Sequence, residues 1–281
     1  MQNDPVDVLI IGAGASGAAI AWSLVETRMR ILCLEQGSHI EDKDFPSRDH
    51  DYELARYGRF SCDPNVRRQK QDYPIEVSNS CIAPVNYNGV GGSTINFLGH
   101  WPRMRPSDFR TKSLDGVGED WPINYEALSP FYEMNDHNTG VSGLGGNPAY
   151  PKYSPELPPI PMGKLGQTLA EGFNKIGWHW WPSDVAILSQ DHNGRQKCVN
   201  AGTCDLGCAA GAKGGTNFTY WPMLRSTGVE LRTECRVREI IVDEKTGFAT
   251  GAIYHGSDGQ VYEQKAEMVI VACNGVGTPR L

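Results

Sequence analysis

Residues 6–17 have the sequence VDVLIIGAGASG, an apolar run that passes directly into three closely spaced glycines. A short, continuous apolar run bounded by glycine is typical of a buried strand in a parallel sheet. Residues 14–26 are rich in alanine and other good helix formers, and residues 30–35 (RILCLE) form a second short apolar run. We therefore predict a strand, a helix and a second strand within about 30 residues, the usual size of a β-α-β unit.

The glycines of this unit have the spacing Gly-x-Gly-x-x-Gly at Gly12, Gly14 and Gly17. The first permits a tight turn, the second lets backbone approach a pyrophosphate, and the third lets the helix pack on the strand. Free N–H groups and the helix dipole stabilise a phosphate there. Glu35 ends the second strand, where a carboxylate can accept hydrogen bonds from ribose hydroxyls. We expect a dinucleotide site; the alternative is a tight turn without a ligand.

The chain does not continue with a second β-α-β unit after Glu35, as a classical NAD domain would. Residues 36–80 are polar and charged and predict a surface excursion. A second glycine cluster, GVGGSTIN at 89–96, follows. A larger cofactor needs more places of close backbone approach, which glycine allows. This cluster favours FAD over NAD, although a plain glycine-rich loop is the alternative.

The later part of the chain contains neither an internal repeat nor a low-complexity tract. Helices are predicted from Tyr125 and over 164–178, and Ser129-Pro130 resembles a separate helix start. From Val229 onward the pattern alternates, which is typical of strands. We predict strands at 237–242, 251–255, 261–265 and 268–272, the first three forming a meander.

Composition excludes several classes of protein. The 281 residues include 26 Lys and Arg against 33 Asp and Glu, a formal net charge of −7. With 40% apolar and 21% charged residues the chain is not disordered, and 32 Gly with 18 Pro exclude a long coiled coil. The acidic balance argues against nucleic acid as a partner.

No apolar run reaches the roughly 20 residues of a membrane helix, so we expect no transmembrane segment. The first five residues contain no basic side chain and make a poor signal peptide. We therefore expect a cytoplasmic protein, with peripheral membrane association through a partner left open. In that compartment the eight cysteines are expected to be reduced thiols.

Several further motifs carry a resemblance to one family. The chain resembles the N-terminal half of a glucose–methanol–choline (GMC) oxidoreductase. The residues that carry it are GVGGSTINF at 89–97, WPR at 101–103, PSDF at 106–109, DWPINYEAL at 120–128, FY at 131–132, GVSG at 140–143, VIVACNG at 269–275 and GTPRL at 277–281. The resemblance implies an FAD-dependent enzyme that oxidises the CH–OH group of a small alcohol or sugar by hydride transfer to flavin, with an electron-acceptor protein as a further partner.

The resemblance also implies a fold and its division. We expect an α/β protein, with a Rossmann-like FAD-binding domain that includes a three-strand β-meander and is interrupted by part of a substrate-side domain. The expected FAD-binding parts are 1–112 and 196–281, and 113–195 begins the substrate-side region. The family's catalytic base would lie beyond Leu281, so the chain is expected to be truncated and inactive alone. None of the seven histidines is expected to be catalytic, and His100, His179 and His255 are expected to be structural or surface residues.

Cofactor contacts follow from the same resemblance. The pyrophosphate would be held near Gly12, Gly14, Ala15, Ser16 and Gly17. The adenosine ribose would meet Glu35, with Gln36 beside it, and the adenine would meet Val237, with Ala272 and Gly275 nearby. The pyrophosphate and flavin edge would be lined by Gly91, Gly92, Ser93 and Asn96. Asn96 stands one place earlier than in the commonest form of the family, an arrangement similar to the bacterial membrane-associated sugar dehydrogenases.

Three cysteines, Cys198, Cys204 and Cys208, are close enough in sequence to hold an iron–sulfur cluster. Related sugar dehydrogenases open this pattern with adjacent cysteines, whereas Lys197 precedes Cys198 here. We therefore predict that the chain holds no metal. Two alternatives stay open: an iron–sulfur flavoprotein subunit that passes electrons to a cytochrome, and a non-catalytic FAD-binding fragment. The tryptophans at 178, 180 and 181 could line a sugar site, but packing is the role we expect.

Overall fold

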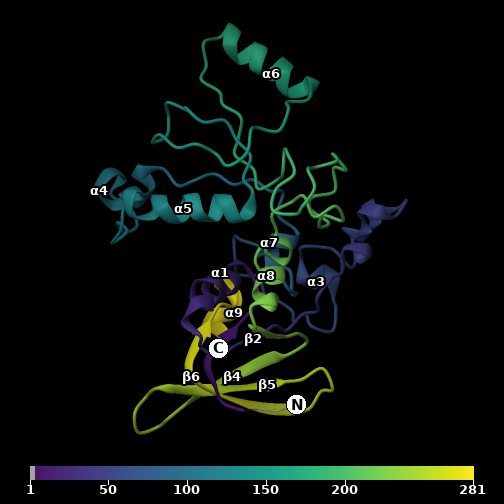
Figure 1. Ribbon diagram of the computed structural model, residues 1–281, viewed down its shortest axis with the longest axis vertical. Helices are drawn as coiled ribbons and strands as arrows, with labels where there is room; N and C mark the ends of the chain where they lie inside the picture. The colour runs from purple at the N-terminus through teal and green to yellow at the C-terminus, as the bar shows by residue number, and fades with distance from the viewer. Residues whose placement is uncertain (1–3) are drawn as a thin grey trace. The chain divides into compact units, whose positions relative to one another are not determined.

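The computed structural model describes residues 4–281, which form two compact units. The first unit contains the chain up to Phe97 together with 202–209 and 215–281, and the second contains 98–201 and 210–214. The chain thus leaves the first unit and returns to it. As a result, β1 (Val6–Ile11), near the start of the chain, and β6 (Val261–Val271, yellow in Figure 1), near its end, belong to one sheet.

The first unit is built on a six-stranded sheet with the order β3-β2-β1-β6-β5-β4. β2 spans Ile31–Leu34 and β3 spans Glu230–Arg232, and both run parallel to β1. β5 (Ala249–His255) lies between β4 (Arg236–Val242) and the first half of β6 and is antiparallel to both. The predicted α/β fold with a three-strand meander is confirmed.

β6 differs from the sequence prediction. Residues 261–265 and 268–272 are not two strands, because one continuous strand covers Val261–Val271. Its first half pairs with β5, up to Lys265, and its second half pairs in parallel with β1, starting at Ala266. The polar residues at its middle are tolerated because the strand changes partners there. The short strand β3 was not predicted, since three residues carry too little periodicity.

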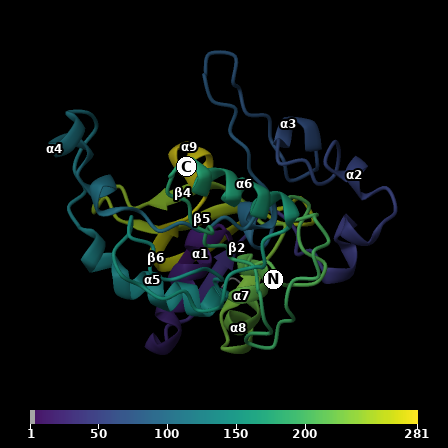
Figure 2. The same ribbon diagram turned by 90° about the horizontal axis from the view of Figure 1, so that it is seen from above.

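Alternate residues of β1 point to opposite faces of the sheet, as a pleated strand requires. Val8 and Ile10 pack on one face with helix α1 (Ala15–Leu24) and with Trp221 and Leu224 of α8 (Trp221–Ser226). Leu9 and Ile11 pack on the other face, against the meander. A short helix α7 (Thr216–Thr219) precedes α8, and α9 (Asn274–Arg280) follows β6. Figure 2 shows α1 beside the sheet from a second direction.

Residues 36–80 do more than cover the surface. They contain the short helices η2 (Asp42–Asp44), η3 (Pro46–Arg48), α2 (Tyr52–Ala55) and α3 (Pro64–Arg67), followed by η4 (Gly92–Ile95). A separate apolar cluster holds this region, with Phe45, Phe60, Tyr87, Ile95 and Leu206 buried in it. The interpretation of 36–80 as a mere surface excursion was incomplete, because single aromatic residues without periodicity build this core.

The second unit consists of short helices joined by extended segments. It contains η5 (Pro106–Phe109), α4 (Thr111–Asp115), α5 (Tyr125–Thr139) and α6 (Lys164–Lys175). The prediction that Ser129-Pro130 starts a separate helix was wrong, because α5 runs through both residues. Its N-cap is Asn124, whose side chain accepts a hydrogen bond from Ala127 N–H. No helix within residues 4–281 is both long and apolar enough to cross a bilayer.

Candidate functional site

A cavity of ≈ 210 Å³ lies at the carboxyl ends of β1 and β2, entirely within the first unit. Ligands of open α/β sheets bind at this end of the strands. The lining residues come from the first glycine motif, the end of β2, the second glycine cluster, the meander and α9. They are Ile11, Gly12, Gly14, Ala15, Ser16, Leu34, Glu35, Gln36, Tyr73, Tyr87, Asn88, Gly92, Ser93, Thr94, Cys235, Val237, Ala272, Cys273, Asn274, Gly277 and Arg280.

The first glycine motif has three different local requirements. Gly12 has a φ of 105°, and a Cβ there would lie 2.6 Å from the Ala272 carbonyl oxygen. A Cβ at Gly17 would lie 1.9 Å from the Gly12 carbonyl oxygen, so this glycine lets α1 pack close to the turn. Gly14 differs, because its φ is −75° and a Cβ would meet nothing closer than the Gly92 Cα at 3.9 Å. The absence of a side chain at Gly14 therefore leaves open space in the cavity, although the packing of the protein would accommodate a Cβ there.

The two glycine clusters meet in space. Gly91 N–H donates to the Ala13 carbonyl over 2.9 Å, and a Cβ on Gly92 would lie 2.9 Å from the Gly14 Cα. Gly91 and Gly92 both have positive φ, 102° and 52°, which favours glycine. The second cluster thus brings bare backbone against the N-terminal end of α1, where a pyrophosphate would lie.

Glu35 is buried in this cavity with its carboxylate held by main-chain donors. Ala13 N–H donates to Oε2 and Gly37 N–H donates to Oε1, both over 2.8 Å. Desolvation raises the pKa of Glu35, while the main-chain hydrogen bonds act in the opposite direction. Each carboxylate oxygen has a second lone pair, so the group can still accept hydrogen bonds from two ribose hydroxyls.

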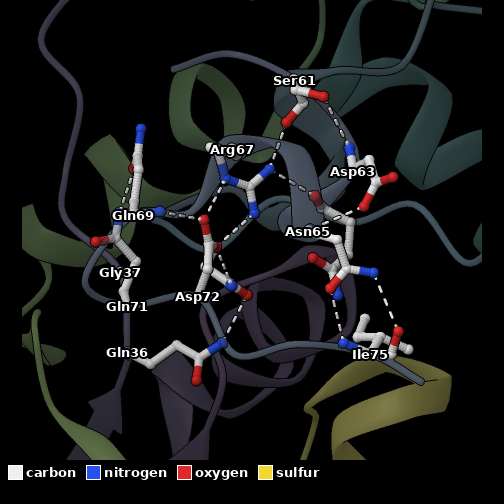
Figure 3. A network of polar contacts seen from close by, with 12 residues as sticks. Gln36, Gly37, Ser61, Asp63, Asn65, Arg67, Gln69, Gln71, Asp72 and Ile75 are labelled. Carbon is white, nitrogen blue, oxygen red and sulfur yellow. Dashed lines mark hydrogen bonds and ion pairs between the residues drawn. The ribbon is translucent and has the colours of Figure 1, made fainter. Parts of the chain in front are cut away.

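A buried polar network supports the residues beside Glu35 (Figure 3). Arg67 makes a two-fold contact with Asp72, with Nε to Oδ2 at 2.9 Å and Nη2 to Oδ1 at 2.6 Å. Asn88 Nδ2 donates to Asp72 Oδ1, and Gln36 Nε2 donates to Asn88 Oδ1. Since Gln36 and Asn88 both line the cavity, the ion pair fixes part of its wall from behind.

The structure brings most of the predicted cofactor residues to the cavity, but not all of them. Four lie outside its lining: Gly17, Gly91, Asn96 and Gly275. The Asn96 amide instead donates to the main-chain carbonyls of Phe60, at 3.1 Å, and Asp205, at 2.7 Å. Its Oδ1 is buried without a hydrogen-bond partner among the described residues. The flavin contact of Asn96 stays a prediction.

Sequence reasoning missed several lining residues, among them Tyr73 and Arg280. The guanidinium carbons of Arg236 and Arg280 lie 4.9 and 5.1 Å from the centroid of the Tyr73 ring. Tyr73 belongs to a segment without periodicity, so no pattern signalled it. Cys273 and Asn274 belong to the stretch from Ala272 to Gly275 that the resemblance placed near the adenine, and both line the cavity.

The remaining candidates lie elsewhere. His100 and His179 belong to the second unit, where each ring contacts a polar side chain, Ser183 and Asn147 respectively. His255 ends β5. Trp178 stacks on Phe173, Trp180 Nε1 donates to Asn174 and Trp181 Nε1 donates to the Leu144 carbonyl, contacts that agree with packing roles. Cys198 belongs to the second unit, whereas Cys204 and Cys208 belong to the first.

Comparison with known proteins identifies the family. Residues 160–281 match the family described as GMC oxidoreductase, and residues 10–69 match an NAD(P)-binding Rossmann-like domain. The chain is 40% identical to a 2-methyl-1,2-propanediol dehydrogenase of Mycolicibacterium austroafricanum, over 99% of this chain and 50% of that protein. It is 27% identical to the fructose dehydrogenase large subunit of Gluconobacter japonicus, over 100% and 55% of the two chains.

Solved structures show the same fold. A pyridoxine 4-oxidase from Mesorbium loti aligns with a TM-score of 0.62 at 18% identity, over 97% of this chain and 50% of that one. A formate oxidase aligns with a TM-score of 0.62 at 16% identity, over 100% and 47% of the two chains. The chain spans about half the length of the relatives it matches. These matches confirm the resemblance seen in the sequence and, with it, FAD as the cofactor. The chain belongs to the GMC oxidoreductases and corresponds to the N-terminal half of their chains.

Proposed function

We propose that this chain forms the cofactor-holding half of an FAD-dependent oxidoreductase that oxidises the CH–OH group of a small alcohol or sugar. The observation that carries the proposal is the single cavity in which Glu35 and the two glycine clusters meet. Two relatives, a diol dehydrogenase and a fructose dehydrogenase subunit, carry names of this chemical class. A 2-methyl-1,2-diol is therefore the first substrate to test.

The residues present fit the adenosine diphosphate part of FAD. Gly14 leaves an opening at the first turn of α1, where main-chain N–H groups favour negative charge. Glu35 has lone pairs for the ribose hydroxyls, and the buried Val237 lies at the edge of the meander for the adenine. When bound, FAD supplies the acceptor for a hydride from the substrate carbon.

The roles outside the cavity are part of the same proposal. Residues 113–195 begin the substrate-side region, and the base that takes the hydroxyl proton lies in a part of the enzyme beyond this chain. The electron acceptor is oxygen, a quinone or a cytochrome. One relative is named as the large subunit of a fructose dehydrogenase, and another as the flavoprotein of a gluconate 2-dehydrogenase from Pantoea cypripedii. Because both names describe one component of an enzyme, an acceptor protein is worth testing.

Gly14→Ala tests the cavity as the cofactor site. Its φ is −75° and the nearest atom to a Cβ would be the Gly92 Cα at 3.9 Å, so the apo fold should lose only the roughly 1 kcal/mol that alanine costs at a helix N-cap, while the methyl group blocks the approach of a pyrophosphate. Titration of the purified chain with FAD, followed by flavin fluorescence, should show binding to the parent and at least tenfold weaker binding to the variant. Gly163→Ala is the control, since its φ is −68° and its Cβ would meet nothing within 4 Å.

Equal FAD affinity in Gly14→Ala and parent would refute the cofactor site. The activity is tested separately with the product of the complete gene, which is mixed without oxygen with alcohols, diols and sugars. Loss of the visible flavin absorbance on mixing is the expected result. A flavoprotein that binds FAD normally but is never bleached by any CH–OH compound would refute the proposed reaction alone.

A further inference from the structure

Three potential metal ligands lie together in the second unit, away from the cofactor cavity. They are His137, Glu156 and His192, and their ligand atoms all lie within 4.8 Å of one another. His137 Nδ1 is 3.0 Å from Glu156 Oε1. The two imidazole rings have centroids 5.5 Å apart and are nearly perpendicular, at 86°. The sequence did not signal this group, because its members come from three distant segments.

The backbone holds each of the three residues at a defined place. His137 lies in the last turn of α5, which ends at Gly140 with a φ of 78°. Glu156 precedes Leu157, whose N–H donates to the Val141 carbonyl over 2.9 Å. His192 begins a tight turn in which its own N–H and carbonyl bond to those of Arg195, over 3.0 and 2.9 Å.

Gly140 lets the His192 ring approach the end of α5. A Cβ at position 140 would lie 2.4 Å from Leu188 Cδ2 and 2.9 Å from His192 Cδ2. The turn at 192 contains Asn193 and Gly194, with φ values of 47° and 76°, the pair of left-handed residues that a type I′ turn requires. Both glycines thus serve the placement of this histidine.

The hydrogen bonds suit a metal-binding histidine. His192 Nε2 lies 2.7 Å from the main-chain oxygen of His137, so this nitrogen carries the proton and the lone pair is on Nδ1. Metal-bound histidines usually have such a bond from the other ring nitrogen, because it fixes the tautomer and the ring orientation. In a tetrahedral site with ligands about 2.1 Å from the metal, donors are roughly 3.4 Å apart, so His137 and Glu156 need only a small movement.

The charges nearby permit a cation. Glu156 contributes a negative charge, and its side chain and that of His137 are 31% and 58% exposed, so ions can reach them. Arg195, three residues after His192, has its guanidinium held by the main-chain carbonyls of Thr139 and Gly211. Asp136, one residue before His137, forms an ion pair with Arg103, so the Arg103 charge is already balanced by a carboxylate.

We propose that His137, Glu156 and His192 bind one divalent transition-metal ion of the zinc type. Two imidazoles and a carboxylate are ligands that Zn²⁺, Co²⁺ and Ni²⁺ accept, whereas Mg²⁺ prefers oxygen ligands alone. Water completes the coordination at the exposed side. The ion links the end of α5 to the segments around 156 and 192, and thereby braces the second unit.

Calorimetric titration of the chelator-treated chain with ZnCl₂ at neutral to slightly alkaline pH tests this site, since the ligands must be deprotonated. We expect one Zn²⁺ per chain, no binding of Mg²⁺, and binding at least about tenfold weaker in both His192→Ala and Glu156→Gln. His179→Ala is the matched control, because His179 is an exposed histidine of the same unit outside the group. It should bind zinc like the parent.

Cysteines are the competing ligands, so Cys204→Ser is measured in parallel. Zinc binding that survives His192→Ala and Glu156→Gln but disappears in Cys204→Ser would overturn the proposal, and so would a parent chain that binds no zinc. Circular dichroism shows whether each variant is folded. Glu156→Gln keeps the size of the side chain, so it decides the question if His192→Ala does not fold.

Discussion

The carboxylate of Glu35 is preorganised for a ligand by the main chain around it. Main-chain N–H groups on both sides fix its two oxygens, and burial raises its pKa. The sequence predicted this residue because the end of a second strand after a glycine motif is a recurring place for an acid. It could not predict the Arg67–Asp72 pair behind the cavity, since ion pairs across a loop follow no period.

Replacing Glu35 by Gln should weaken FAD binding by about ten- to hundredfold, because hydrogen bonds to a charged acceptor contribute roughly 1.5–3 kcal/mol. The apo fold should lose less stability than the complex. Fluorescence titration gives the affinity, and urea unfolding gives the stability. Glu263→Gln, an exposed carboxylate on β6, is the control and should leave both unchanged. Parent-like FAD affinity in Glu35→Gln would show that the carboxylate does not touch the ribose.

The same carboxylate predicts a pH dependence. Its raised pKa means that the empty folded chain takes up a proton more readily than the unfolded chain, so ionised Glu35 lowers the stability of the apo form as pH rises through that pKa. FAD favours the ionised form, so its affinity should fall on acidification through the same range. The step should be absent in Glu35→Gln, and a step of equal size there would assign it to another group.

At the scale of elements, sequence patterns worked where an element has one environment along its whole length and failed where the environment changes within the element. The β-α-β unit at 6–35 was predicted because its strands are buried on both faces. β6 was split in two by prediction, since its first half alternates beside β5 and its second half is apolar beside β1. In α5 the predicted start at Tyr125 was right, but the second start suggested by Ser129-Pro130 was wrong, because the helix runs through Pro130.

Asn124→Ala should lower the free energy of unfolding of the second unit by about 1 kcal/mol, because the first turn of α5 loses the acceptor for Ala127 N–H. Asn124→Asp should restore it, since a carboxylate accepts the same bond and suits the helix N-terminus. Urea denaturation followed by circular dichroism measures both. If the alanine variant unfolds like the parent, the start of α5 is held by packing and not by its cap.

At the scale of the whole molecule, three cysteines bear on whether the protein carries an iron–sulfur cluster. They are Cys198, Cys204 and Cys208, and they lie within eleven residues of sequence. Three thiolates are the least that a three-iron cluster requires, and Lys197 takes the place of a further cysteine. We expect no iron after anaerobic purification, by metal analysis and electron paramagnetic resonance. About three irons per chain, lost in Cys204→Ser, would contradict this and favour an electron-transferring subunit.

The two units should also respond differently to the cofactor. A ligand that binds only the folded site stabilises it by about 2.7 kcal/mol when its concentration is 100 times its dissociation constant. The population of the locally opened state then falls about a hundredfold. With FAD present, hydrogen exchange should therefore slow by up to that factor in α1, in 35–36 and in 87–94, segments that each contribute residues to the lining of the cavity. Exchange in α5 of the second unit should not change. In Gly14→Ala the protection at the same FAD concentration should fall at least about tenfold, because the methyl group weakens FAD binding while the fold remains. Equal protection of α1 and α5 would mean that the two units open together, and no protection anywhere would place FAD outside this cavity.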